Sequence, residues 1–461
     1  MERKIKLGIA PTRRNMFIRE EAIKYKSLIL DKMREWNLDF VDLEWLNEEG
    51  LLYDVSFVDE VEKRFQEEKV DALFIPHCNF GSEEAVCKLA KRLGKPVLLW
   101  GPRDDAPLKD GLRQRDSQCG LFATSKVLSK MGVPFTYIEN CWIDDPAFEK
   151  GVKRFLQTAS VVKAFRNMKI GQIDTRPGAF WSVMCNESEL LEKFNIEIVP
   201  LTLVDLQTGI GRQMADHFEE VQSTALKIKK DFIYDFSDKD MEKMAALKLV
   251  LKDWIDKKGI SAIAIQCWDA MQDILGVMPC FVNSLLTEEG FPVVCETDIN
   301  GAISAVLTQA ALNYSKPIFF ADLTIRHPEN DNAELLWHCG PFPASLRREG
   351  SEAKLGIHYT LESKCPGVCE WELKKGELSI CRFDGINGEY SLTAAKGKCI
   401  DGPRSRGTYA WVEFSNWVKL EKKLVYGPYI HHVAGIYGDI IPALEEAIRY
   451  MPGVKNDIFT E

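Results

Sequence analysis

The chain has 461 residues, of which 46% are hydrophobic and 28% are charged. This balance excludes a largely disordered chain, and the length predicts two or three domains. The formal net charge of −10 is spread along the chain, so nucleic acid is not the expected partner.

Neither an N-terminal signal peptide nor a membrane span is expected from the sequence. The first residues lack the apolar stretch of a signal peptide, and no segment reaches the roughly 20 apolar residues of a membrane span. The 13 cysteines are odd in number and scattered, which favours reduced thiols and a cytoplasmic location. Cys365 and Cys369 have no second pair beside them, so a structural zinc site is only weakly indicated.

Residues 1–167 are predicted to form a first α/β domain. A β-branched strand at Lys4–Ala10 is followed by the helical periodicity of Ala22 to Met33. Strands then alternate with helices, which predicts a doubly wound parallel sheet whose ligands lie beyond the carboxyl ends of the strands. The further strands are expected at Phe40–Leu43, Ala72–Pro76 and Val97–Trp100, and the helices near Val58–Phe65 and Ser82–Leu93.

Two further domains follow in the predicted order. Residues 168–350 are expected to form a second doubly wound α/β domain, and residues 351–461 a smaller β-rich domain with a terminal helix at Ile440–Tyr450. The strands of the second domain are expected at Lys169–Ile173, Ile196–Pro200, Ala262–Gln266, Val293–Cys295 and Ile318–Phe320, and those of the third at Leu378–Phe383, Gly385–Leu392 and Thr408–Phe414. Gly209 and Gly211 lack the rest of a dinucleotide fingerprint and are discounted.

Two acids stand out because each follows the end of an apolar strand. Glu296 follows Val293–Cys295 and Asp322 follows Ile318–Phe320, one βα step later. We therefore expect the two acids on neighbouring strand ends, close enough to share a metal ion and to move a carbon-bound proton. The common alternative for an acid after a strand is a helix N-cap, which is our interpretation of Asp298.

The seven histidines include an adjacent pair, His431 and His432, and a third among apolar residues, His338. Neighbours in an extended segment face opposite ways, so one of the pair can enter a site while the other cannot. A histidine in such surroundings is more often a core residue than a ligand, but neutral imidazole is also the commonest metal ligand.

Arginines and one aromatic segment are candidates for substrate binding. Arg13 follows the first strand, and Arg115 lies in a polar run after the strand that ends at Trp100; a solvated loop with ion pairs is an equally good interpretation of each. Gln266 and Trp268 end a strand of the second domain, where the indole could stack on a sugar or simply pack the core.

These motifs together resemble the L-fucose and L-arabinose isomerase superfamily, over essentially the whole chain, and the early motifs resemble its fucose-isomerase-like branch. The resemblance implies that Glu296, Asp322 and His432 bind Mn²⁺, or Co²⁺ or Mg²⁺, with both acids as proton carriers. His432 is preferred to His431 because it stands five residues before Tyr437, and His338 resembles an additional ligand of the arabinose branch. The segments that carry the resemblance are Cys295–Asp298 with Gly301–Ala302, Ala321–Asp322, Trp337–Gly340, His432–Gly438, Pro11–Arg14 and Arg115–Gly120.

The resemblance predicts a metal-dependent aldose–ketose isomerase that acts through a cis-enediol. It also implies a homo-oligomer, commonly a trimer or hexamer, in which a neighbour's first domain closes the active site. A sugar-binding module without turnover and a metal-dependent hydrolase are the competing hypotheses. L-fucose, D-arabinose, L-arabinose and substituted or anionic hexoses all remain as substrates.

Overall fold

The computed structural model of the chain describes residues 4–268, 270–358 and 364–460. Contacts divide the chain into two compact units. The N-terminal unit extends to Lys163 and includes Arg449–Pro452, and the main unit holds Ala164–Ile448 with Gly453 onward. The division of the chain into three domains stays a prediction.

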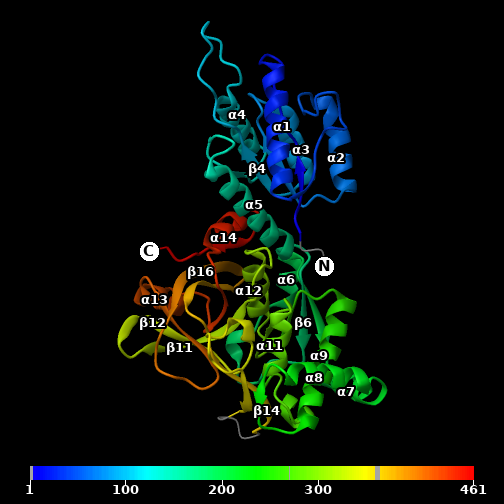
Figure 1. Cartoon of the computed structure of the whole chain (residues 1–461), viewed down its shortest axis with the longest axis vertical. Helices are drawn as coiled ribbons and strands as arrows, with labels where there is room; N and C mark the ends of the chain where they lie inside the picture. Colours follow the sequence, from blue (N-terminus) through cyan, green and yellow to red (C-terminus); the bar gives the residue numbers. More distant parts are fainter. Residues whose placement is uncertain (1–3, 269, 359–363, 461) are drawn as a thin grey trace. The chain divides into compact units, whose positions relative to one another are not determined.

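The N-terminal unit is built on a five-stranded parallel sheet, in the order β2-β1-β3-β4-β5. Apolar side chains of its central strands are buried, as a sheet covered by helices requires (Figure 1). The parallel sheet is confirmed, whereas the doubly wound arrangement of the helices stays a prediction. The strands are β1 (Lys6–Ile9), β2 (Asp39–Val41), β3 (Ala72–Pro76), β4 (Val97–Trp100) and β5 (Thr136–Tyr137), and the helices are α1 (Arg19–Glu35), α2 (Val58–Glu67), α3 (Glu83–Leu93), α4 (Ser117–Lys130) and α5 (Pro146–Phe165).

The main unit begins with a four-stranded parallel sheet, in the order β10-β9-β6-β7. Its last helix, α12, is buried along its whole length, and its buried polar side chains find partners inside the protein, as when Asn300 donates to Asp384 (2.9 Å). The strands are β6 (Lys169–Ile173), β7 (Glu197–Leu201), β9 (Ala262–Ile265) and β10 (Val293–Val294), and the helices are α6 (Glu187–Phe194), α7 (Leu203–Asp216), α8 (Phe218–Lys229), α9 (Asp238–Lys258), α10 (Ala270–Leu275), α11 (Cys280–Glu288) and α12 (Ile299–Ala310).

The β-rich part of the main unit contains a closed ring of strands, β16-β15-β18-β11-β12-β17, because β17 also pairs with β16. The predicted β-rich C-terminal part is thus confirmed, as a barrel. The ring strands are β11 (Phe319–His327), β12 (Asn330–His338), β15 (Gly376–Ile386), β16 (Glu389–Ile400), β17 (Thr408–Phe414) and β18 (His432–Ile436); β8 (Ile233–Tyr234), β13 (Lys354–Ile357), β14 (Pro366–Glu372) and β19 (Val454–Asn456) extend the sheet, and α13 (Trp417–Tyr426) and α14 (Ile441–Ile448) cover it.

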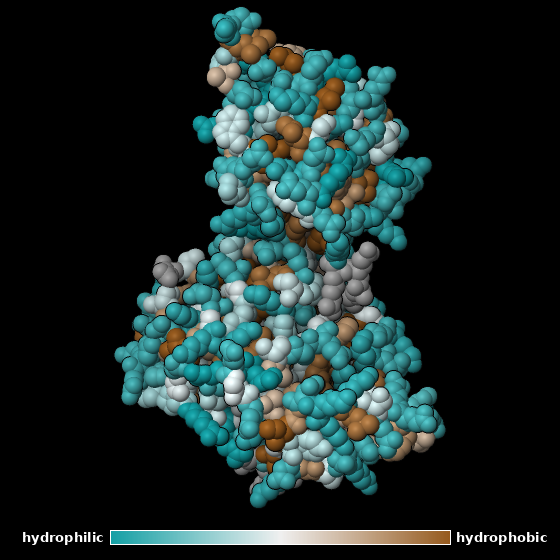
Figure 2. Space-filling view, viewed as in Figure 1, coloured by the Kyte–Doolittle hydropathy of each residue, from teal (hydrophilic) through white to brown (hydrophobic). Residues whose placement is uncertain are grey.

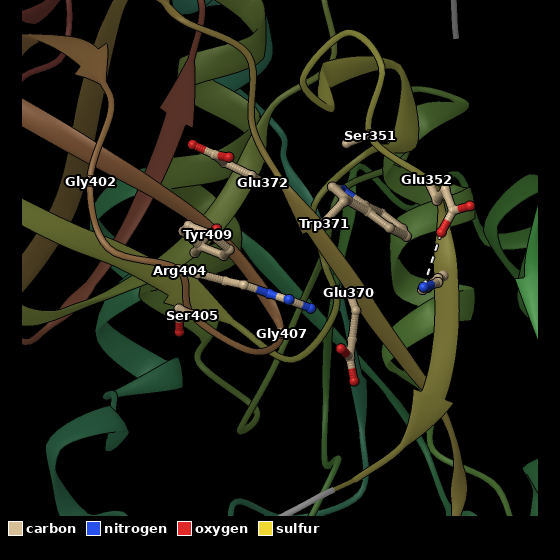
Figure 3. Close-up of a pocket in the computed structure, with 11 residues that line it drawn as sticks. Ser351, Glu352, Glu370, Trp371, Glu372, Gly402, Arg404, Ser405, Gly407 and Tyr409 are labelled. Atoms are coloured by element: carbon tan, nitrogen blue, oxygen red, sulfur yellow. Dashed lines mark ion pairs between the residues drawn. The ribbon is translucent and has the colours of Figure 1, made fainter.

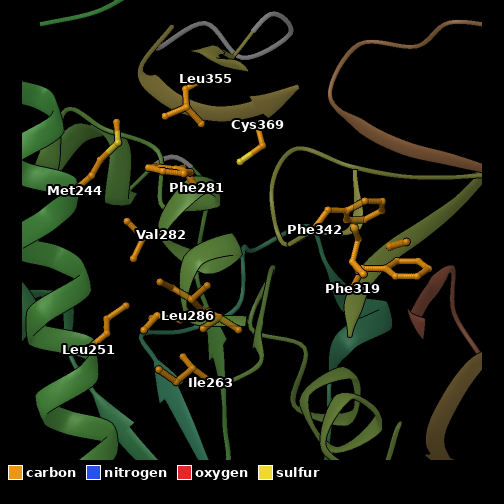
Figure 4. Packing of buried hydrophobic residues seen from close by; sticks show 14 of the residues in the cluster. Met244, Leu251, Ile263, Phe281, Val282, Leu286, Phe319, Phe342, Leu355 and Cys369 are labelled. Atoms are coloured by element: carbon orange, nitrogen blue, oxygen red, sulfur yellow. The ribbon is translucent and has the colours of Figure 1, made fainter. Parts of the chain in front are cut away.

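One sequence-based expectation about this part is wrong. The strand before Asp322 was expected beside the strand before Glu296, but it is β11, which pairs with β12 and β18 in the barrel and not with β10. Both acids nevertheless lie in one body, because the parallel sheet, α12 and the barrel share a hydrophobic core. Figure 4 shows part of that core, where Ile263 of β9, Leu251 of α9 and Phe319 of β11 contribute to the same cluster.

The face drawn in Figure 2 is dominated by polar side chains, with hydrophobic residues scattered among them. Among the residues that the structure describes, no helix combines the length and the apolar character needed to cross a bilayer.

Candidate active site

Glu296 stands on a strained turn between β10 and α12. Glu296 and Thr297 both adopt the left-handed backbone conformation, with φ of 56° and 55°. For residues other than glycine this conformation costs roughly 1–3 kcal/mol each, and such strain is common at functional sites. The turn is held by the Thr297 amide, which donates to the Ile265 carbonyl at the end of β9 (3.1 Å). The carboxyl group of Glu296 is buried by this arrangement.

Asp322 and His432 meet through strand pairing. They are direct partners in the antiparallel register of β11 and β18, so their side chains leave the sheet on one face. His432 Nε2 lies 3.4 Å from Asp322 Oδ1 and 3.6 Å from Glu296 Oε2. The structure therefore brings together the three residues that the resemblance proposed as metal ligands.

His338, at the end of β12, faces the same point. Its Nε2 lies 3.6 Å from Glu296 Oε2 and 3.9 Å from Asp322 Oδ1. The ring is buried, and Phe320 contacts both it and His432. His431, the alternative to His432, is exposed, although one of its ring nitrogens lies within 4.8 Å of ligand atoms of Asp322 and His432.

The donor atoms suit a divalent cation. Glu296 Oε2 and Asp322 Oδ1 are buried acceptors that have no hydrogen-bond partner among the residues the structure describes. An unpaired buried carboxylate oxygen is costly unless a cation or donor occupies the space in front of it. Two carboxylate oxygens and one imidazole nitrogen that converge at these separations match the ligand types of Mn²⁺ and similar ions.

The charges of the site also favour a bound cation. Four acids gather here, namely Glu296, Asp298, Asp322 and Asp384, and among the described residues Arg382 is the arginine that is ion-paired with two of them, Asp298 and Asp384. Burial raises the pKa of Asp322 to about 6, against the opposing effect of the two histidines. Burial also acts to raise the pKa of Glu296, but His338 and His432 outweigh it and hold that pKa below its usual value. A bound cation would offset the excess of negative charge.

Behind His432 lies a polar network that sequence reasoning missed. His432 Nδ1 is 2.9 Å from Asp298 Oδ2, and Arg382 donates to both oxygens of Asp298 and to Asp384. Asp298 is also the N-cap of α12, as interpreted from the sequence, because it accepts from the Gly301 amide (2.9 Å). Burial favours the neutral form of Asp298, but Arg382 and then His432 outweigh it and hold its pKa well below the usual range. The sequence did contain a sign of this network, because Arg382 and Asp384 are charged residues two positions apart, and so on one face, in an otherwise apolar strand.

The segment that follows β9 also contacts Glu296. The Cys267 thiol donates to Glu296 Oε1 (3.2 Å), and the predicted substrate-binding residues Gln266 and Trp268 are the neighbours of Cys267 in the sequence. Gln266 Oε1 is buried without a hydrogen-bond partner in the described part of the chain. Trp268 is 38% exposed and packs edge-on against Phe180. Their roles in substrate binding stay predictions.

Arg13 and Arg115 belong to the N-terminal unit, and both are buried there in ion pairs. Arg13 donates to both carboxylate oxygens of Glu49. Arg115 donates to Asp105 (3.1 Å) and lies over the ring of Tyr25. Ion pairing, one of the two sequence interpretations, is thus observed, while their contribution to an active site stays a prediction.

A surface pocket of about 340 Å³ lies elsewhere on the barrel (Figure 3). Trp371, Tyr409 and Arg404 line it, together with acids that are already in ion pairs, such as Glu352 with Lys354 and Glu370 with Arg406. None of the acids and histidines described above lines this pocket, so we do not assign the chemistry to it. Among the described residues, two groups of side chains lie close enough together to hold a metal ion, namely Cys267, Cys295 and Glu296, and Asp322, His431 and His432. Cys365 and Cys369, the weak zinc candidate, belong to neither group.

Comparison with known proteins supports the resemblance inferred from the sequence. Residues 8–166 match the family model of the fucose/sulfoquinovose isomerase N-terminal domain. The chain is 28% identical to a sulfoquinovose isomerase of Priestia aryabhattai, across 83% of this chain and 84% of the relative, and 26% identical to one of Alkalicoccus urumqiensis, across 82% and 84%. Over residues 8–166 the chain is thus similar to the fucose/sulfoquinovose isomerase family, as the predicted fucose-isomerase-like resemblance requires, and these relatives indicate an aldose–ketose isomerase.

Proposed function

We propose that this chain interconverts an anionic hexose of the sulfoquinovose type and the corresponding ketose, with a divalent metal ion, foremost Mn²⁺, held by Glu296, Asp322 and His432. The observation that carries the metal proposal is the convergence of two unpaired carboxylate oxygens on His432 Nε2, at 3.6 and 3.4 Å. The substrate class is supported by the names of the relatives, all of which are sulfoquinovose isomerases.

The protein's own groups supply the proton chemistry in this proposal. One carboxylate of the pair Glu296 and Asp322 takes the proton from C2 of the open-chain aldose while O1 gains a proton, which gives a cis-enediol. The other carboxylate then delivers a proton to C1 while O2 loses its proton, which leaves the ketose; the net change at the two oxygens is transfer of one proton from O2 to O1. A divalent ion at this site supplies Lewis-acid stabilisation of the negative charge that develops on the sugar oxygens.

Two features of the site fit these roles. The side chain of Asp322 is 21% exposed while that of Glu296 is 6% exposed. The two acids therefore have different environments, which is how one of a pair of carboxyl groups is made the acid and the other the base. His432 is oriented from behind by Asp298, a common device for fixing a ligand imidazole.

The test is a panel of aldoses that includes sulfoquinovose, L-fucose and L-arabinose, incubated with the protein and Mn²⁺ and assayed for ketose. We expect turnover of sulfoquinovose in D₂O to place deuterium at C1 of the product. Complete absence of label would contradict proton transfer, and hydrolysis or binding without turnover would contradict the isomerase proposal.

Removing either acid should greatly reduce this activity. We expect Glu296→Gln and Asp322→Asn each to lower kcat/KM by about 100- to 10,000-fold, the usual contribution of a positioned acid or base, and more where metal is also lost. Bound metal is measured in parallel by elemental analysis. Near-normal turnover by either variant would remove that acid from the mechanism.

A further inference from the structure

The two histidines of the site differ in what holds their Nδ1 atoms. His432 Nδ1 lies 2.9 Å from Asp298 Oδ2, and Arg382 donates to the same carboxylate. An ionised carboxylate can only accept hydrogen bonds, so His432 Nδ1 carries the hydrogen. Its Nε2 then presents a lone pair toward Glu296 and Asp322, as a metal ligand must.

His338 has the opposite arrangement. The backbone amide of Cys339 donates to His338 Nδ1 at 2.9 Å. A backbone N–H can only donate, so Nδ1 presents its lone pair here, and the hydrogen of the neutral ring is on Nε2. The Cys339 sulfur lies 3.3 Å from the same Nδ1. His338 Nε2 is therefore a donor and has no lone pair to offer a metal ion.

This N–H is left without a hydrogen bond by the part of the chain that the structure describes. His338 Nε2 is buried and forms no hydrogen bond to any residue that the structure describes. The nearest carboxylate oxygens, Glu296 Oε2 and Asp322 Oδ1, are 3.6 and 3.9 Å away, beyond normal hydrogen-bond length. A buried donor in this position needs an acceptor that arrives with the substrate or solvent.

We infer that His338 is a substrate-binding residue, whose Nε2–H donates a hydrogen bond to an oxygen atom of the sugar, and that it is not a fourth metal ligand. This inference rests on the proposed function for the presence of the metal and the sugar. The oxygen concerned is a carbonyl or hydroxyl oxygen close to the reacting carbons, since Nε2 faces the same two carboxylates that handle the proton. An N–H fixed in this place stabilises negative charge on such an oxygen.

The surrounding contacts hold the ring in this orientation. His338 ends β12, and its carbonyl accepts from the Thr408 hydroxyl of the neighbouring β17 (2.8 Å). Cys339 is fixed in turn by Cys280, whose sulfur lies 3.1 Å from its own. Gly340 permits this approach, because a Cβ at that position would overlap Cys280. The donor is thus presented by a rigid part of the barrel.

The decisive experiment compares His338→Gln, His338→Asn and His432→Gln in the full chain. Mn²⁺ affinity is measured by calorimetry, and turnover is measured at saturating Mn²⁺. We expect both His338 variants to bind Mn²⁺ within about threefold of the wild type, and His432→Gln to bind more than about 100-fold more weakly. We expect kcat/KM to fall about 100-fold in His338→Asn, and less in His338→Gln, whose amide can replace the Nε2–H.

A second measurement does not depend on any variant folding. Pulsed electron paramagnetic resonance of Mn²⁺ in the wild-type chain, grown with ¹⁵N-histidine, should detect one directly bonded histidine nitrogen. Two bonded nitrogens, or a loss of Mn²⁺ affinity in the folded His338 variants as large as in His432→Gln, would overturn the inference. Unchanged kcat/KM in His338→Asn would overturn it as well. Failure of the proposed function is a different result, namely a wild-type chain that binds no divalent ion or converts no sugar.

Discussion

The buried carboxylate of Asp298 has both a structural contact and a contact with the candidate metal ligand His432. Its Oδ1 caps α12 at the Gly301 amide, and its Oδ2 faces His432 Nδ1. The N-cap preference of aspartate explains the first contact from local sequence alone. The second contact needs β18, which is 134 residues away along the chain. A residue that is ordinary by its local pattern can therefore orient a candidate metal ligand.

At this scale we expect Asp298→Asn to weaken Mn²⁺ binding by about 10- to 100-fold, the usual cost of losing a partner behind a ligand histidine. Asparagine still caps a helix well, so α12 should form normally. Arg382 loses one of its two carboxylate partners, which should lower the free energy of unfolding by roughly 1–3 kcal/mol. Calorimetry with Mn²⁺ and chemical denaturation measure the two effects.

Asp384→Asn is the matched control for this prediction. It removes the other carboxylate of Arg382 and leaves the contact between Asp298 and His432 in place. We expect a similar loss of stability but Mn²⁺ affinity within about threefold of the wild type. Equal loss of affinity in both variants would mean that Asp298 acts only through the fold.

At the scale of elements, the site depends on the register between β11 and β18. Asp322 faces His432 in this pair, and Phe319 faces Gly435 three residues along. The ring of Phe319 occupies the space in which a side chain at position 435 would lie. Glycine is therefore required for the two strands to pair closely beside the site.

We expect Gly435→Ala to lower the free energy of unfolding by roughly 1–3 kcal/mol, because the added methyl group overpacks a closed core. Displacement of β18 should weaken Mn²⁺ binding at the same time. Gly211→Ala is the control, since nothing lies within 4 Å of a Cβ there, within α7. That change should be neutral or stabilising by up to about 1 kcal/mol. The stabilities of the Gly435→Ala and Gly211→Ala variants are compared by their denaturant midpoints. A Gly435→Ala chain as stable as the wild type would contradict the conclusion that β11 and β18 need glycine at position 435 to pair closely.

At the scale of the whole molecule, the acids and histidines of the site all lie in the main unit, whereas Arg13 and Arg115 lie in the N-terminal unit. The family resemblance implies that a neighbour's first domain closes the active site. Each arginine is held by acids of its own unit, so each is positioned independently of the metal ligands. The predicted closure of the site by a neighbour's first domain makes assembly of several copies a testable requirement for activity.

We expect Arg13→Gln to impair activity without changing the metal content, and Glu296→Gln to be inactive. Mixing the two variants during assembly should then restore activity, because some sites combine an intact Glu296 with a neighbour's intact Arg13. Random assembly of a cyclic oligomer gives about a quarter of such sites. Co-expression with two affinity tags isolates the mixed oligomers for assay. Full activity of Arg13→Gln alone, or no activity in the mixture, would exclude a shared site of this kind.

The sequence by itself determined much of this protein. Periodicity located the strands Ala72–Pro76, Val97–Trp100, Lys169–Ile173 and Thr408–Phe414 at the bounds that the structure gives them. The acids and histidines at the ends of apolar segments also singled out Glu296, Asp322, His338 and the pair His431 and His432, and the family resemblance then favoured His432 within that pair. These signals are local, and burial of an apolar face acts on a few neighbouring residues at a time.

Only the tertiary structure decided how those residues meet. The local pattern before Asp322 is the same for a strand of a parallel sheet and for a strand of a barrel, so the sequence could not place β11 beside β18. The same holds for Arg382, which reaches Asp298 only because α12 packs between the parallel sheet and the barrel. Contacts between distant segments are set by closure of the barrel and by the shared core. Neither can be predicted from the residues of a short segment, because both depend on how segments that are far apart in the sequence pack together.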